Sequence, residues 1–152
     1  MKINIYQIVK NSNDSFEPIL KEFIKMSSKY AVVEIHSLFN KKIAKAQTIG
    51  QNEAQKAYNE LYIPKLTNGY NIALDVLGKK IDSYKFSDLI SNHNIINFYI
   101  GGAYGFNKEF LLKCDTTISL SNLTMAHKIA NVVLVEQVFR ALCIANNHPY
   151  HK

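Results

Sequence analysis

Residues 95–105 read Ile-Ile-Asn-Phe-Tyr-Ile-Gly-Gly-Ala-Tyr-Gly, an apolar run that stops abruptly at two glycines. The apolar half is typical of a buried strand, and the glycines permit positive φ and a close approach of the backbone to a ligand. A second strand-like run at residues 116–120 is followed by the small polar loop Ser-Asn-Leu-Thr-Met at residues 121–125. Two strand-to-loop transitions therefore lie close together, and both precede the longest helix pattern in the chain.

The rest of the chain alternates strand and helix patterns. After a first strand, turn and N-cap residues at 11–15 lead into apolar residues that recur at helical spacing from 16 to 29. A strand, a helix and a second strand in succession predict parallel pairing. We therefore expect an α/β fold with a mostly parallel sheet, whose five strands lie at residues 2–9, 31–38, 70–76, 95–100 and 116–120.

Composition indicates a globular protein with a mild excess of positive charge, which by itself more often reflects solubility than function. The 152 residues are 47% hydrophobic and 20% charged, values of a single domain covering residues 1–152. The formal charge of +6 favours an acidic partner such as nucleic acid. Cys114 and Cys143 stand far apart in apolar contexts and are expected to be buried thiols of a cytoplasmic protein. The N-terminus lacks the apolar core of a signal peptide, and no stretch is apolar enough to predict a membrane span.

The pattern from His127 to about Asn146 predicts the longest helix, with apolar side chains all around it. A helix that is apolar on every side must be buried on more than one. We expect a second copy of the chain to cover part of it, giving a homodimer with this helix at the interface. Glu136 and Arg140 stand at i, i+4 in the favourable order, either as a plain intrahelical pair or with a role at the interface or site.

Several kinds of site are disfavoured because their motifs are absent. No G-x-G-x-x-G follows the first strand and no G-x-x-x-x-G-K-[ST] occurs, so neither a Rossmann dinucleotide site nor a P-loop is predicted. H-E-x-x-H and metal-spaced Cys/His sets are also absent, which predicts no metal centre.

In open parallel sheets, ligands bind beyond the carboxyl ends of the strands. Three loops qualify for such a site: residues 74–80, 101–105 and 120–125.

The tail of the chain, residues 146–152, reads Asn-Asn-His-Pro-Tyr-His-Lys. Tyr can stack on a base, Lys can contact phosphate, and His can titrate near neutrality. The candidate catalytic residues are therefore His148, Tyr150 and His151. The alternative is a frayed terminus, the default for most proteins, against which the stiffness of Pro149 argues weakly.

Five motifs occur in a fixed order along the chain. They are Leu74-Asp75-Val76-Leu77-Gly78-Lys79, Ile100-Gly101-Gly102-x-x-Gly105, Ser119-Leu120-Ser121-x-Leu123-Thr124-x-x-His127, Glu136-Gln137-Val138-Phe139-Arg140-Ala141 and Pro149-Tyr150-His151. Each motif is weak alone, but the ordered set is specific. It resembles the ribosomal RNA large subunit methyltransferase H family of the SPOUT superfamily, and the resemblance covers essentially the whole chain. Asn131 departs from the pattern, since the family commonly has Arg there.

The resemblance implies a SPOUT-type α/β knot, with a deep C-terminal trefoil knot, and a homodimer. It also implies S-adenosylmethionine as methyl donor and N3 of a pseudouridine in 23S ribosomal RNA of the ribosome as acceptor, with no DNA or membrane partner. The family's cofactor site carries over to residues within the three loops named above. These residues are Leu74, Gly101, Leu120, Ser121, Asn122, Leu123, Thr124 and Met125.

The resemblance also suggests how the tail takes part. N3 must lose its proton before it can be methylated, so His148 or His151 could act as the base while Tyr150 stacks on or orients the target base. The alternative is that alignment of the reactants does most of the work and the tail only binds. Two other classes of function stay open for the chain. One is a catalytically inactive ribosome-binding relative, which would not bind S-adenosylmethionine. The other is a small hydrolase using His148 or His151, for which no adjacent nucleophile is recognisable.

Overall fold

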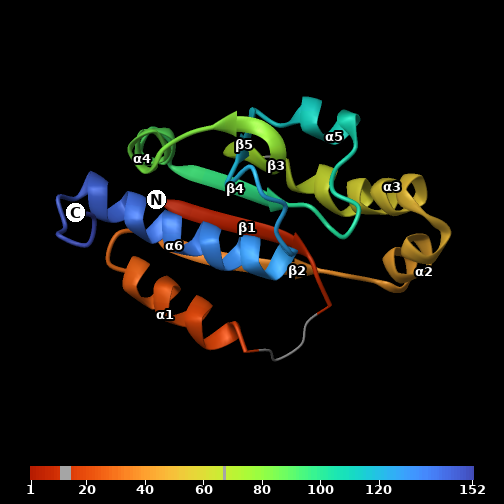
Figure 1. Ribbon diagram of the computed structural model, residues 1–152, viewed down its shortest axis with the longest axis horizontal. Helices are drawn as coiled ribbons and strands as arrows, with labels where there is room; N and C mark the ends of the chain where they lie inside the picture. The colour runs from red at the N-terminus through yellow and green to blue at the C-terminus, as the bar shows by residue number, and fades with distance from the viewer. Residues whose placement is uncertain (11–14, 67) are drawn as a thin grey trace.

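The computed structural model of the protein describes residues 1–10, 15–66 and 68–152, and Figure 1 shows how its elements are arranged. Five strands form one sheet in the order β2-β1-β4-β3-β5, and all of their recorded pairings are parallel. The strands are β1 Lys2–Ile8, β2 Val32–Leu38, β3 Tyr70–Lys80, β4 Ile95–Ile100 and β5 Thr116–Ser119. The predicted α/β fold with a parallel sheet is confirmed, and the trefoil knot stays a prediction.

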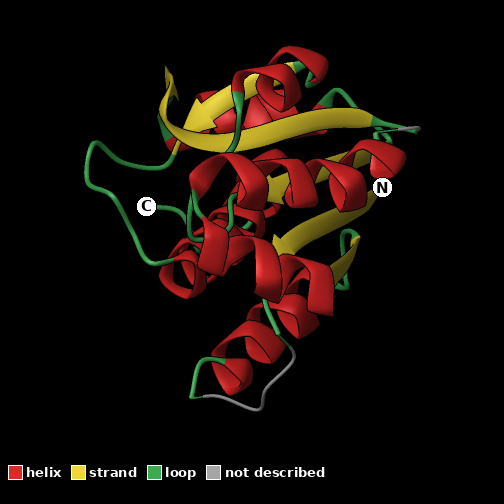
Figure 2. Ribbon diagram, turned by 90° about the vertical axis from the view of Figure 1, so that its right-hand side faces the viewer, coloured by secondary structure: helices red, strands yellow, loops and turns green. Residues whose placement is uncertain are grey.

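Helices lie on both sides of the strands (Figure 2) and give the sheet two different cores. One core is mainly aliphatic and contains side chains such as Ile5, Phe98 and Leu134. It is covered by α1 Glu17–Ser27, α4 Ser83–Ser91 and α6 His127–Ala145. The other core is rich in tyrosine and phenylalanine. It is covered by α2 Lys41–Ile49, α3 Gln51–Tyr62, the short 3₁₀ helix η1 Ile63–Lys65 and α5 Lys108–Lys113.

Strand β3 differs from the prediction because it runs four residues beyond Val76, to Lys80. Its pairing with β5 breaks after Leu74 and resumes at Lys79, and both of these residues lie opposite Ile118. Gly78 makes this path possible, since a Cβ at that position would be 2.6 Å from the carbonyl carbon of Ile118. Two backbones can approach this closely only where one residue has no side chain. Residues 77–80, expected in a loop, therefore wrap against β5 as strand.

Two other local expectations meet the structure differently. The turn and N-cap residues expected at 11–14 lie outside the described residues. The N-cap position of α1 is Phe16, whose side chain makes no capping hydrogen bond.

Cys143 is buried and Cys114 half-buried, both as free thiols, and burial raises the pKa of the Cys114 thiol to about 12. Within the described ranges, none of the helices combines the length and apolar character that a bilayer crossing requires.

Helix α6 is covered by its own chain to a greater extent than its sequence suggests. It packs against α1, α4 and the sheet, which bury Leu134, Val135, Val138 and Leu142. Its own chain therefore buries most of this helix without a partner, and the homodimer with this helix at the interface stays a prediction. What remains half-exposed is an outer stripe, which consists of Ile129, Val132 and Val133.

Candidate active site

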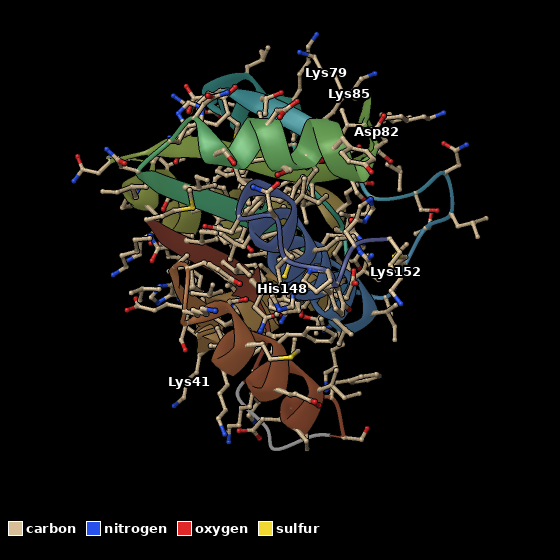
Figure 3. All side chains as sticks on the ribbon, turned by 90° about the vertical axis from the view of Figure 1, so that its left-hand side faces the viewer. Lys41, Lys79, Asp82, Lys85, His148 and Lys152 are labelled. Atoms are coloured by element: carbon tan, nitrogen blue, oxygen red, sulfur yellow. The ribbon has the colours of Figure 1, made fainter. Side chains whose placement is uncertain are left out.

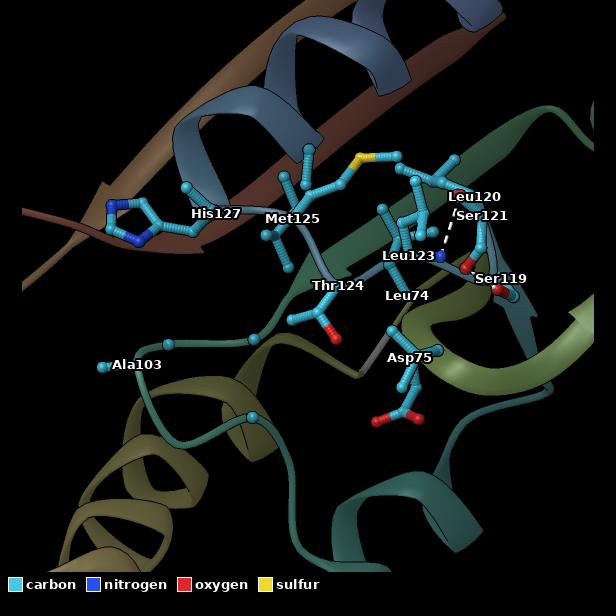
Figure 4. A pocket seen from close by; sticks show the side chains of 17 residues that line it. Leu74, Asp75, Ala103, Ser119, Leu120, Ser121, Leu123, Thr124, Met125 and His127 are labelled. Atoms are coloured by element: carbon cyan, nitrogen blue, oxygen red, sulfur yellow. Dashed lines mark hydrogen bonds between the residues drawn. The ribbon is translucent and has the colours of Figure 1, made fainter.

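A cavity of about 330 Å³ opens at the carboxyl ends of β3, β4 and β5 (Figure 4). Its walls are the end of β3, the loop after β4, the loop after β5 and the first turns of α6. This is where parallel strands leave backbone groups free for a ligand, and the volume is that of a small-molecule site. The topology thus brings together the three loops that the sequence singled out.

Seven of the eight residues predicted to hold a cofactor line this cavity: Leu74, Gly101, Leu120, Ser121, Leu123, Thr124 and Met125. Asn122 does not line it, and its side chain is exposed. The Ser121 hydroxyl accepts a hydrogen bond from the Leu123 backbone N–H at 3.0 Å, and the turn that it closes leaves Asn122 facing outward. The positive φ expected at the glycine pair falls instead on Gly105, at 63°.

Asp75 and His127 also line the cavity, although neither was among the predicted cofactor residues and only Asp75 lies in one of the three predicted loops. Both stand in the motifs quoted above, which was the signal that could have found them. Asp75 accepts a hydrogen bond from the Leu77 backbone N–H at 2.9 Å. Burial, followed by the neighbouring Lys128, lowers the pKa of His127, so its imidazole is neutral at pH 7. Among the described lining residues, only Asp75 then carries a full charge, and the cavity suits a cationic ligand.

The tail is docked on the far half of α6. The Glu136 carboxylate accepts hydrogen bonds from Arg140 Nε and from the Tyr150 hydroxyl, each at 3.0 Å. Arg140 also lies 4.8 Å over the Tyr150 ring and 3.3 Å from Nδ1 of His151. The His151 ring meets Tyr84 of α4 edge-on at 4.8 Å. Tyr150 and His151 are therefore held, not frayed, and the Glu136–Arg140 pair is more than an intrahelical ion pair.

These contacts assign the proton on His151. A guanidinium can only donate, so Nδ1 of His151 accepts from Arg140 and Nε2 carries the imidazole hydrogen. Nδ1 of His148 accepts a bond of 3.3 Å from the Tyr150 backbone N–H, and the His148 side chain is exposed. Figure 3 views the molecule from this end and labels His148 and Lys152. His148 is thus the less constrained of the two imidazoles.

The structure does not bring the tail and the cavity together within one chain. Tyr150 and His151 contact α6 at Glu136 and Arg140, which lie about 14 and 20 Å along the helix axis from His127 at 1.5 Å per residue. Figure 1 shows the C-terminus beyond the end of α6 that is remote from its start. The predicted cofactor residues and the predicted catalytic residues therefore form two separate groups.

Asn131, which departs from the motif pattern, faces the interior. It is 2% exposed, and its amide donates to Oε1 of Gln7 in β1 at 3.0 Å. A side chain buried in this way ties α6 to the sheet and is not exposed to a nucleic acid at the surface.

Comparison with known proteins agrees with the motifs. The family described as "Predicted SPOUT methyltransferase" matches residues 1–151. The chain belongs to the SPOUT methyltransferase family. A curated relative from Aliarcobacter butzleri (strain RM4018), called ribosomal RNA large subunit methyltransferase H, is 70% identical over 152 residues and covers both chains completely. Relatives with the same name occur in Campylobacter concisus (strain 13826), 47% identical, and in Campylobacter fetus subsp. fetus (strain 82-40), 50% identical, each over all of both chains. The resemblance carried by the motifs is confirmed.

The lowered pKa of His127 predicts a pH-dependent stability. Because the folded chain disfavours the protonated imidazole, the unfolded chain binds that proton first as the pH falls through the ordinary value of 6.5. Stability should therefore be full above pH 6.5 and be lost as the pH drops below it. We expect His127→Gln to flatten this decline, measured as urea unfolding midpoints between about pH 5 and 8.

His36 is a matched control, because burial lowers its pKa as well and it lies outside the cavity. His36→Gln should retain the contribution of His127, and the double variant should be flatter than either single one. Profiles of wild type and His127→Gln that run parallel would contradict the account of His127.

Proposed function

We propose that this protein transfers a methyl group from S-adenosylmethionine to N3 of a pseudouridine in 23S ribosomal RNA, as a cytoplasmic enzyme whose residues 1–152 act as one domain. The observation that carries the proposal is the 70% identity, over the full length of both chains, with a ribosomal RNA large subunit methyltransferase H. The cavity supports it independently, because it lies at the loops to which the motifs assign a cofactor.

The residues of the cavity fit this cofactor. Leu74, Leu120 and Met125 offer apolar surface to an adenine ring, and the loop backbones offer hydrogen-bonding groups. When bound, S-adenosylmethionine supplies an electrophilic methyl group on a positively charged sulfur. Asp75 offers the negative charge that such a cation requires, and the neutral imidazole of His127 adds no repulsion.

We further propose that the active site is completed across a homodimer. The half-exposed stripe of α6, which consists of Ile129, Val132 and Val133, lies between the cavity end of the helix and the docked tail. If two copies pair through this stripe in antiparallel fashion, the start of one α6 faces the end of the other. The tail of each protomer then lies beside the cavity of its partner, which removes the separation seen in a single chain.

In this arrangement each tail residue has a distinct role. His148, whose side chain is exposed, takes the proton from N3 of the target base at Nδ1, which must first release the hydrogen bond that it accepts from the Tyr150 backbone N–H. His151 presents its Nε2–H as a donor to a carbonyl of that base, because Nδ1 is held by Arg140. Tyr150 is packed by Phe139 and Arg140 and bonded to Glu136, so it fixes the position of both histidines. Stacking of Tyr150 on the base stays a prediction.

Methyl transfer from labelled S-adenosylmethionine tests the function directly. Large ribosomal subunits from a strain that lacks this activity should take up label in their 23S RNA, and subunits from a strain that has it should not. Calorimetry with S-adenosylmethionine separates the alternatives, since a catalytically inactive relative would bind no cofactor. Absence of label from the large-subunit RNA would overturn the proposal.

Separate replacements of the two histidines distinguish their roles. In single-turnover reactions at saturating RNA, His148→Ala should lose about 10²–10⁴-fold in rate, the usual contribution of a general base. His151→Ala should lose roughly tenfold, as expected for one hydrogen bond. Unchanged rates in both variants would leave the tail with a binding role only.

Mixed dimers test whether the site is shared between protomers. One chain carries His148→Ala with His151→Ala, and the other carries Gly101→Val, whose added Cβ would be 3.0 Å from the Gly105 Cα in the cavity wall. If each site combines one cavity with the partner's tail, the mixed dimer contains one intact site and should have roughly half of the wild-type activity. If the site lies within one chain, both sites are damaged and the mixed dimer stays inactive. The mixed species can be purified by two affinity tags.

A further inference from the structure

Helix α3 turns an unusual face toward the sheet. Gln55, Tyr58, Asn59 and Tyr62 follow each other at i, i+3, i+4 and i+7, and they are 8%, 1%, 8% and 0% exposed. A packed helix normally uses leucine or isoleucine at such positions, because burying a polar group costs free energy unless it is hydrogen-bonded. All four of these side chains carry polar groups, so the partners of those groups show what the face is for.

The Tyr58 hydroxyl accepts a hydrogen bond from Gln47 Nε2 of α2 at 2.7 Å. The other three side chains donate to one short segment, residues 100–107, which runs from the last residue of β4 to the start of α5. Gln55 Nε2 donates to the carbonyls of Tyr104 at 2.9 Å and Phe106 at 3.1 Å. The Tyr62 hydroxyl donates to the carbonyl of Ile100 at 2.6 Å. Helix α3 therefore donates hydrogen bonds to both ends of the 100–107 segment.

The other two side chains hold the same segment. Asn59 Nδ2 donates to Oδ1 of Asn107 at 3.1 Å, and that oxygen also caps the start of α5. The Tyr58 ring lies against the backbone of Gly102, where an added Cβ would be 2.6 Å from the ring carbon that bears the hydroxyl. The ring and the loop backbone are therefore in close contact, and a larger residue at position 102 would push the loop into the cavity.

The opposite side of this segment is the wall of the cavity, since Gly101, Gly102, Ala103 and Gly105 line it. Within the loop, the Gly105 N–H donates to the Gly102 carbonyl at 2.9 Å. A glycine-rich loop with so little internal support has many conformations available, and it loses them on binding a ligand unless something else fixes it.

We propose that Gln55 and Tyr62 are positioning residues that hold the 100–107 loop in the shape that binds S-adenosylmethionine. This inference rests on the proposed function and identifies which part of the chain sets cofactor affinity. Neither residue lines the cavity. Their effect is to fix the loop before the ligand arrives, so that binding does not have to order it.

The test compares Gln55→Met, which keeps the length of the side chain and removes both donated hydrogen bonds, with wild type. We expect the KM for S-adenosylmethionine to rise about tenfold, while kcat at saturating cofactor changes less than about threefold. Tyr62→Phe keeps the ring and removes only the hydroxyl, so KM should rise roughly threefold. Calorimetric Kd values for S-adenosylhomocysteine should follow the same order.

Ser87→Ala is the matched control. It removes one buried hydrogen bond, from the Ser87 hydroxyl to the Ala141 carbonyl at 2.9 Å, between α4 and α6 on the other face of the sheet. This variant should unfold at a lower temperature with an unchanged KM. If Gln55→Met and Tyr62→Phe also lower only the unfolding temperature, α3 has a structural role alone and the inference is overturned.

Two further outcomes are decisive. If Gln55→Met does not fold, Tyr62→Phe decides alone, and an unchanged KM in that variant overturns the inference. If the wild-type protein binds S-adenosylhomocysteine and the variants have the same KM and Kd values as wild type, the proposed function stands and only the role of α3 is rejected. A wild-type protein that binds neither compound overturns both.

Discussion

The rigid helix α6 is the constraint on which the rest of the site depends. Its buried side chains hold it against α1, α4 and the sheet, and the cavity lies at its first turns. The tail contacts it at Glu136 and Arg140, about 14 and 20 Å further along the axis. Rotation of side chains cannot close such a distance. In the dimer proposed above, a second copy of the chain in antiparallel contact with the outer stripe of α6 would supply the missing half without any change of fold.

The two faces of the sheet contribute differently to the structure: one mainly stabilises the fold, and the other positions the loop after β4. The face under α1, α4 and α6 is mainly aliphatic, and its hydrophobic burial is strong but non-directional. On the other face, buried polar side chains bond to one another or to loop backbone, as in the chain from Asn4 through Asn97 to Asn71. On the same face, Gln55 and Tyr62 of α3 donate hydrogen bonds to the segment after β4. Because hydrogen bonds have preferred directions, these contacts determine the shape of that segment.

Much of the fold and of the candidate site could be predicted from local sequence pattern. The features that could not be predicted depend on contacts between segments that are distant in the sequence. The strand at residues 95–100 has the predicted bounds, because its sequence pattern is local. The cavity loops were predicted because loops after parallel strands meet at one edge. The path of residues 77–80 depends on Ile118, about forty positions away, and the cover on α6 comes from α1 and α4. Periodicity carries no information about either contact.

The charge of the cavity and the charge of the whole protein have opposite signs, which is what two differently charged ligands require. The chain carries +6 overall, so long-range attraction favours an anionic RNA. Within the cavity the one full charge among the described lining residues is the Asp75 carboxylate. Burial and the neighbouring Lys128 keep His127 neutral at the start of α6, so its imidazole adds no positive charge against a cationic donor. A protonated His127 would oppose the attraction of Asp75 for a cation, so the lowered pKa of His127 favours a cationic cofactor at neutral pH.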